Sequence, residues 1–132
     1  MNAYRRVNLK EVEDQAPKFG HAPDLEARFA SGALGLSKSG LSYQRLAAGK
    51  RMPFGHRHTE QEEIYVVLAG GGRLKLEDEV VELTSMDAVR VPPETRRQLE
   101  AGPDGIEILA FGAPRTGSAS RDAEMLPGWW SD

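Results

Sequence analysis

The sequence predicts an all-β fold, an antiparallel sandwich or barrel built from about eight short strands. Fourteen glycines and eight prolines divide the 132 residues into short segments, which favours strands over long helices. Several of these segments are rich in β-branched and aromatic residues, and they recur at a spacing of about 8 to 12 residues. No apolar run approaches the roughly 18 residues of a membrane-spanning helix.

Length and composition indicate one domain with an ordinary hydrophobic core, since 39% of the residues are hydrophobic. The absence of cysteine excludes disulfides, thiolate metal sites and cysteine nucleophiles. Seventeen basic and twenty acidic residues give a formal charge of −3, so no basic bias indicates a nucleic-acid partner. The first residues lack the apolar segment of a signal peptide, and a cytoplasmic location without a membrane partner is expected.

Residues 1–33 are predicted to form an N-terminal extension that precedes the strand-rich region. Asp24 is a suitable N-cap for a short helix over Leu25–Ala30. Gly32 would end that helix, because glycine readily adopts the conformation that follows a helix C-terminus. The extension is therefore expected to contribute one short helix and little else to the fold.

The strand-rich region covers residues 34–112, and its strongest strand signal is Ile64–Leu68, which contains no breaker. The glycine run Gly70–Gly72 is expected to stop this strand, and Ala101–Gly105 is expected to be a turn between the last two strands. The strands predicted from these signals are, in order, Leu41–Ala47, Met52–His58, Ile64–Leu68, Arg73–Leu76, Val80–Leu83, Asp87–Val91, Thr95–Glu100 and Ile106–Gly112.

Residues 113–132 form a polar C-terminal tail that ends with two large aromatic side chains, Trp129 and Trp130. Two exposed indole rings would leave much apolar surface in water. We therefore expect them to dock on the outside of the strand-rich region or on a neighbouring subunit. This apolar surface is the basis for predicting a homodimer.

Two histidines and an acidic pair form the clearest chemical signal in the chain. Because side chains alternate along a strand, His56 and His58 share one face of the strand expected over Met52–His58. A turn at residues 59–61 would return Glu62 or Glu63 beside them from the adjacent strand. Two imidazoles and one carboxylate are a metal-ligand set suited to Fe, Mn, Ni or Zn. The same pattern also occurs as solvated surface histidines, so this alternative stays open.

The residues around this set resemble the first conserved motif of the cupin superfamily, of the small single-domain type. In that comparison Gly49, His56, His58, Glu63 and Gly70 fall on the motif's glycines, histidines and glutamate, with Gly49 one residue early. The resemblance implies a jelly-roll barrel, the double-stranded β-helix, over residues 34–112. It also implies that His56, His58 and Glu63 are the metal-ligand positions.

A second cupin motif is similar to the segment that begins at Asp87 and contains Pro92-Pro93. Two departures from the pattern replace its glycines by Met86 and Glu94. A third places Arg97 where the motif has another metal-binding histidine. A guanidinium has no lone pair for a metal. Arg97 therefore either points outward and leaves a three-ligand site, or points inward and pairs with Glu63 in place of a metal.

Strand alternation also selects candidates for binding a small organic ligand inside the barrel. Gln44 is expected to face inward, and Tyr65 has the same parity as Glu63. Together with Arg97 they are the candidate ligand-binding residues. The first hypothesis is a cupin that binds a divalent metal and a small ligand. The alternative is a metal-free binding or sensor module with Arg97 in place of the third histidine. The residues leave open whether the chain is an enzyme, because cupins include both enzymes and binders.

Overall fold

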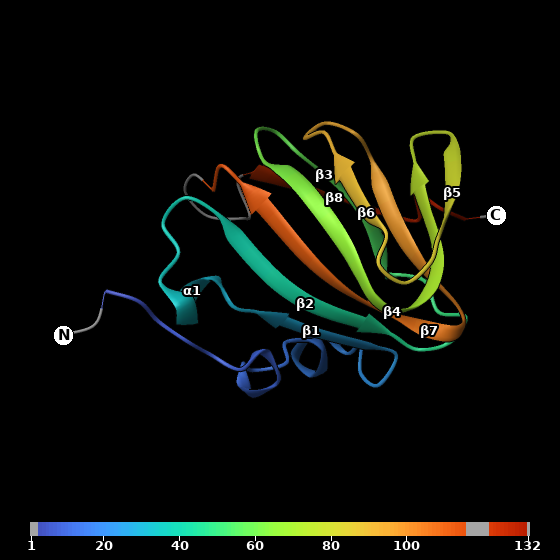
Figure 1. Cartoon of the computed structure of the whole chain (residues 1–132). Coiled ribbons are helices and arrows are strands. Elements are labelled where there is room, and N and C mark those ends of the chain that lie inside the picture. Colours follow the sequence, from blue (N-terminus) through green and yellow to red (C-terminus); the bar gives the residue numbers. More distant parts are fainter. Residues whose placement is uncertain (1–2, 116–121, 132) are drawn as a thin grey trace.

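The computed structural model describes residues 3–115 and 122–131, and these residues form a curled antiparallel sheet with very little helix (Figure 1). Its eight strands are β1 Leu25–Phe29, β2 Gly40–Leu46, β3 Phe54–His58, β4 Glu62–Leu76, β5 Glu79–Leu83, β6 Ala88–Val91, β7 Arg97–Ala113 and β8 Ala123–Pro127. Two 3₁₀ turns, Leu9–Glu11 and Ala16–Phe19, and the short helix α1, Ser31–Leu34, precede β2.

Among the described residues, the complete helices have only three or four residues each. Helices of this length are too short to span a membrane. The all-β jelly-roll fold predicted from the sequence is confirmed. The division into extension 1–33, barrel 34–112 and tail 113–132 stays a prediction.

The sheet folds over on itself because its two longest strands, β4 and β7, run through both faces of the barrel. On one face, the first half of β4 pairs with β6 and with the second half of β7, which continues to β2 and β1. On the other face, the second half of β4 pairs with β5 and with the first half of β7, which continues to β3 and β8. The two faces that enclose the interior are therefore parts of one continuous hydrogen-bonded sheet.

The prediction that Gly70–Gly72 stops a strand is wrong, although the bulge that the same glycines were expected to form is present. The turn predicted at Ala101–Gly105 is wrong as well. Both segments lie inside the long strands, where the register of β4 against β7 shifts at two bulges. A Cβ atom at Gly70 would lie 2.1 Å from the Gly105 carbonyl oxygen, and one at Gly72 would lie 2.0 Å from the Glu100 oxygen. The glycines thus permit a close approach of two backbones at the bend and do not end the strand.

The short helix expected over Leu25–Ala30 is also absent, because this segment forms β1. Six residues make a marginal helix, whereas the free edge of β2 offers a partner for every residue of β1. Leu25 and Ala27 are buried in the core. Glu26 is buried as well and is held by ion pairs with Lys10, Arg28 and Arg45 at 2.7, 2.5 and 3.0 Å.

The described part of the C-terminal tail packs on its own chain. β8 pairs along the whole length of β3, with Phe54 opposite Pro127 and His58 opposite Ala123. Trp130 is only 5% exposed, and the guanidinium carbon of Arg51 lies 4.0 Å from its ring centroid. The tail therefore covers the outer edge of β3, the strand that carries both motif histidines.

Candidate metal centre and ligand cavity

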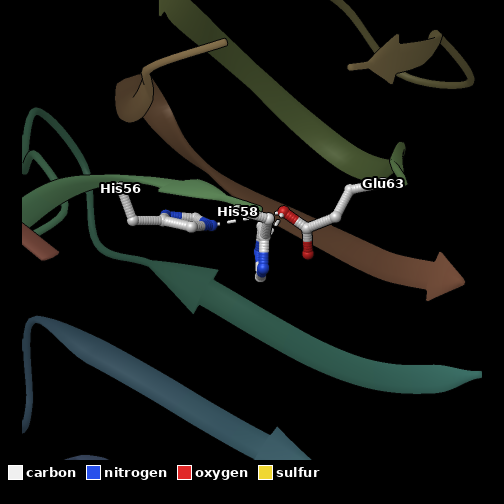
Figure 2. A group of neighbouring side chains, drawn as sticks. All are labelled: His56, His58 and Glu63. Atoms are coloured by element: carbon white, nitrogen blue, oxygen red, sulfur yellow. Dashed lines mark hydrogen bonds and ion pairs between the residues drawn. The ribbon is translucent and has the colours of Figure 1, made fainter. Parts of the chain in front are cut away.

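The two histidines and Glu63 converge inside the barrel, as Figure 2 shows. His56 and His58 project from β3, and Glu63 projects from the start of β4. One carboxylate oxygen, Glu63 Oε1, lies 3.2 Å from His56 Nε2 and 3.3 Å from His58 Nε2. The three ligand atoms lie within 4.8 Å of one another.

The strands that carry these residues differ in one respect from the sequence-based expectation. The prediction places Glu63 on the strand beside the histidines, but β3 and β4 are not hydrogen-bonded neighbours in the described residues. β3 pairs with β7 and β8 on one face, whereas the start of β4 pairs with β6 and β7 on the other. Glu63 therefore reaches the imidazoles across the interior of the barrel.

Asp122 fixes the orientation of the more deeply buried imidazole. Its Oδ2 lies 2.8 Å from His58 Nδ1. A carboxylate only accepts hydrogen bonds, so Nδ1 carries a proton, and in the neutral imidazole Nε2 then carries a lone pair. His58 Nε2 is buried and has no hydrogen-bond partner, although it faces Glu63 Oε1. A cation bound to both atoms would satisfy this lone pair and the carboxylate oxygen together.

These observations fit a divalent metal. Ligand atoms about 2.1 Å from a tetrahedral zinc ion lie about 3.4 Å apart, close to the two distances from Glu63 Oε1 to the imidazoles. Two carboxylates, Glu63 and Asp122, and one guanidinium, Arg97, leave the immediate surroundings with a net negative charge when the imidazoles are neutral. The donor set of two nitrogens and one oxygen suits Fe, Mn, Ni or Zn.

The protonation states in the site are those that metal binding needs. Burial raises the pKa of Glu63, but the neighbouring His56 and His58 imidazoles outweigh burial and hold that pKa well below its ordinary value. Burial lowers the pKa of His56, and the neighbouring Glu63 carboxylate only partly offsets this. At neutral pH the carboxylate is therefore charged and the His56 imidazole is neutral.

Arg97 points into the interior, so the outward alternative for this side chain does not apply. Its side chain is 1% exposed, and Nη2 lies 3.7 Å from Glu63 Oε1. Its two terminal nitrogens also donate hydrogen bonds to the carbonyl oxygens of Pro93 and Pro92, at 3.1 and 3.2 Å. The Pro-Pro segment of the second motif thus holds the guanidinium at the side of the histidine–glutamate group.

A cavity of about 560 Å³ lies beside the candidate metal centre, and Gln44, Tyr65 and Arg97 all line it. Tyr65 is buried and its hydroxyl donates to Glu63 Oε1 at 2.9 Å. Burial raises the pKa of Tyr65 well above its ordinary value, so the hydroxyl keeps its proton. The Gln44 amide donates to Ser42 Oγ at 3.1 Å. The walls are mainly apolar, and they include Leu25, Phe29, Phe54, Leu74, Leu99 and Ile108.

Two contributors to the site were missed by the sequence-based reasoning. Asp122 lies 64 residues after His58 in a polar tail, and no spacing pattern connects the two. The N-terminal extension lines the cavity with Phe19, Leu25 and Phe29, of which the last two belong to β1. The available signal for β1 was the alternation of apolar Leu25, Ala27 and Phe29 with charged residues between them.

The comparisons with known proteins agree with this fold. A family model described as a cupin domain matches residues 42–108. An uncharacterised protein of Methanocaldococcus jannaschii is 38% identical over 72 residues, which are 54% of this chain and 56% of that protein. The chain thus spans about half the length of the curated relative it matches.

Solved cupin structures superpose on most of the chain. A cupin protein from Bacteroides fragilis matches with a TM-score of 0.71 and 26% identity, covering 91% of this chain and 94% of that one. Pac13 from Streptomyces, solved with uridine, matches with a TM-score of 0.73 and 18% identity. The match covers 96% of this chain and 93% of that one. Oxalate decarboxylase from Bacillus subtilis matches with a TM-score of 0.74 and 17% identity, covering 91% of this chain and 32% of that one. The match of the family model over half of the sequence, on this jelly-roll fold, means that the chain belongs to the cupin family.

Proposed function

We propose that this cupin binds one divalent metal ion through His56, His58 and Glu63, and holds a small organic ligand in the adjoining cavity. The observation that carries the proposal is the buried Nε2 of His58, which has no hydrogen-bond partner and lies 3.3 Å from Glu63 Oε1. A bound cation satisfies both atoms at once, because each of them offers it a lone pair.

A divalent metal at this position supplies Lewis acidity toward a polar group of the ligand. The chain's own residues then orient that ligand. The guanidinium of Arg97 offers hydrogen-bond donors at the metal end of the cavity, and the hydroxyl oxygen of Tyr65, whose proton goes to Glu63, offers an acceptor. Gln44 offers an amide on β2, and the apolar walls exclude water from the rest of the ligand.

The shape and lining of the cavity support a ligand with an apolar body and one polar end. A volume of about 560 Å³ is in the range of pockets that hold small organic molecules. One cupin of similar fold, Pac13, is described as a nucleoside dehydratase and was solved with uridine. The identity of that pair is below 25%, so it supports the ligand's size class and not its chemical identity.

A second candidate function is metal-free binding, and the position of Arg97 favours it. Arg97 replaces the third imidazole, is fully buried, and lies 3.7 Å from the Glu63 carboxylate. In this alternative the two side chains form an ion pair that stabilises the barrel and presents hydrogen-bond donors to an anionic or polyhydroxy ligand. In this alternative the Arg97 guanidinium neutralises the Glu63 carboxylate, whereas in the metal proposal the bound cation does so.

Elemental analysis of protein purified without a histidine tag tests the metal proposal. The parent and a His56→Ala/His58→Ala variant are each incubated with Mn²⁺, Fe²⁺, Ni²⁺ or Zn²⁺ under anaerobic conditions and then desalted. We expect near-stoichiometric retention of at least one metal by the parent and almost none by the variant. Equal metal content in the two proteins would contradict the metal proposal and support the metal-free alternative.

Several sequence-based expectations remain predictions. They are a homodimer, a cytoplasmic location, and the absence of nucleic-acid and membrane partners. Sedimentation velocity checks the first of these, since a homodimer has twice the chain's mass of 14.5 kDa.

A further inference from the structure

The C-terminal tail reaches the candidate metal centre through Asp122, which makes contacts with the whole β3–β4 turn. The Asp122 carbonyl oxygen accepts from Thr59 N at 2.8 Å. Its carboxylate accepts from Glu60 N at 2.9 Å and from Gln61 N at 3.3 Å. The same carboxylate lies 2.8 Å from His58 Nδ1. One residue of the tail therefore holds the turn that joins the histidine strand to the glutamate strand.

The contact of Asp122 Oδ2 with His58 Nδ1, at 2.8 Å, decides which nitrogen of the neutral imidazole carries the proton. The ionised carboxylate has no proton to donate, and it selects the His58 tautomer that is protonated on Nδ1. In that tautomer the lone pair of Nε2 is directed at the candidate metal position, next to Glu63 Oε1.

The tail is held firmly enough to act on the site. β8 follows directly after Asp122 and pairs with β3 residue by residue, from His58 opposite Ala123 to Phe54 opposite Pro127. At the end of the tail, Arg51 Nη1 donates to the carbonyl oxygen of Trp130 at 2.7 Å, and its guanidinium lies against the indole ring. Asp122 is itself well covered, with 13% of its side chain exposed.

We propose that Asp122 is a positioning residue of the metal centre, which fixes His58 in the Nδ1–H tautomer and turns Nε2 toward Glu63. The part of this inference that concerns metal affinity rests on the proposed function, whereas the part that concerns the tautomer does not. Partners of this kind change metal affinity by about 10- to 100-fold when they are removed. The tail would then belong to the site as well as to the fold.

Asp122→Asn is the decisive variant, because it keeps the size of the side chain and one acceptor oxygen. The amide can still accept from the backbone of Glu60, but it presents an NH₂ group to His58 Nδ1 and so favours the opposite tautomer. The first readout is the ¹⁵N chemical shift pair of the His58 ring in metal-free protein. The second is the dissociation constant for Zn²⁺ by titration calorimetry. Glu124→Gln is the matched control, since it removes the same charge two residues later, in β8, where Glu124 pairs with Arg57 at 2.6 Å.

We expect the Nδ1–H tautomer in the parent and in Glu124→Gln, the Nε2–H tautomer in Asp122→Asn, and Zn²⁺ binding at least tenfold weaker in Asp122→Asn alone. Asp122→Glu, which retains a carboxylate, should keep the parental tautomer and lose less affinity. A parental protein with the Nε2–H tautomer overturns the inference, even if Asp122→Asn fails to fold. Equal Zn²⁺ affinity in the parent and Asp122→Asn overturns it as well. If the parent binds no Zn²⁺ but the tautomer changes as expected, the proposed function fails and the positioning of His58 stands.

Discussion

At the scale of single residues, Arg97 is the departure from the second cupin motif with the largest chemical consequence. Replacing it with histidine removes a positive charge beside Glu63 and adds a nitrogen donor, and both changes favour a cation. We expect Arg97→His to bind Zn²⁺ at least tenfold more tightly than the parent, which is about 1.4 kcal/mol. Titration calorimetry measures the difference.

Arg97→Met separates the two contributions, because it removes the charge without adding a ligand. Its affinity for Zn²⁺ should lie between those of the parent and Arg97→His. Without Arg97, the two carbonyl oxygens that accept its hydrogen bonds still have backbone donors. Pro92 O accepts from Thr95 N, and Pro93 O accepts from His58 N. Both variants should therefore fold. Metal affinity that is unchanged in Arg97→His would mean that the guanidinium and the metal do not share this space.

A second residue-scale prediction concerns Met86, which stands where the motif has a glycine. Its φ angle is +76°, in the left-handed region that side chains other than glycine rarely adopt, and its side chain is 77% exposed. Met86→Gly therefore removes backbone strain and loses almost no packing. We expect an increase of about 1 kcal/mol in the free energy of unfolding by urea. Met125→Gly in β8 is the control, and it should lose stability.

The residues of the candidate site differ in how far sequence can predict them. Strand alternation and a short turn predicted that His56 and His58 meet Glu62 or Glu63, and the resemblance to the first cupin motif selected Glu63. The inward direction of Tyr65 followed from the same alternation. Asp122 could not be predicted, since its contact with His58 depends on β8 lying along β3. The direction of Arg97 depended on carbonyl acceptors that only the folded Pro92-Pro93 segment provides.

At the scale of secondary-structure elements, β1 is fastened to the barrel through the buried carboxylate of Glu26. Burial raises the pKa of Glu26, but hydrogen bonds from Lys10, Arg28 and Arg45 lower it from 4.5 to about 2. A carboxyl whose pKa is lower in the folded state stabilises the fold above pH 4.5, and this contribution is lost as the pH falls to 2. The loss amounts to about 3 kcal/mol of unfolding free energy.

Urea unfolding of the parent and Glu26→Gln between pH 7 and pH 2 checks this prediction. The variant should be less stable at pH 7 and should lose less stability on acidification, so the two curves approach each other near pH 2. Glu124→Gln serves as the control, because Glu124 is exposed and pairs only with Arg57 at the surface. Parallel curves for the parent and Glu26→Gln would contradict the assignment.

The tail gives a second prediction at this scale. Trp130 is buried and stacked on Arg51, whereas Trp129 is only half-buried beside β3. Trp130→Ala should lower the free energy of unfolding by about 3 kcal/mol or more, as expected for a large buried aromatic. Trp129→Ala should cost clearly less. Equal losses, or no loss from Trp130→Ala, would show that the tail does not anchor β3.

The elements that sequence reasoning placed wrongly share a physical cause. A breaker-rich segment such as Gly70–Gly72 suggests the end of a strand, but here the missing side chains let β4 and β7 bend together. Likewise, the capping signal at Asp24 was a local preference, and the tertiary pairing of β1 with β2 overrode it. Strands inside the motifs, such as β3, were predicted well because local pattern and tertiary pairing agree there.

At the scale of the whole molecule, the jelly roll explains why residues from four distant parts of the chain meet at one site. The barrel interior receives His56 and His58 from one face and Glu63 from the other, and β7 supplies Arg97. β1 and the preceding turns cover one part of the cavity, and the tail strand covers the edge of β3 (Figure 1). The motifs predicted this barrel, whereas the contributions of both ends of the chain emerge only from the folded structure.

The most direct test of the metal proposal is titration calorimetry with Zn²⁺ on the metal-free parent and three single variants, His56→Ala, His58→Ala and His21→Ala. His21 is the control, because it lines the same cavity but lies outside the group of three ligand atoms. The account predicts one Zn²⁺ per chain in the parent and in His21→Ala, and binding at least tenfold weaker in the other two variants. Zn²⁺ affinity that is unchanged by His56→Ala and by His58→Ala would contradict it.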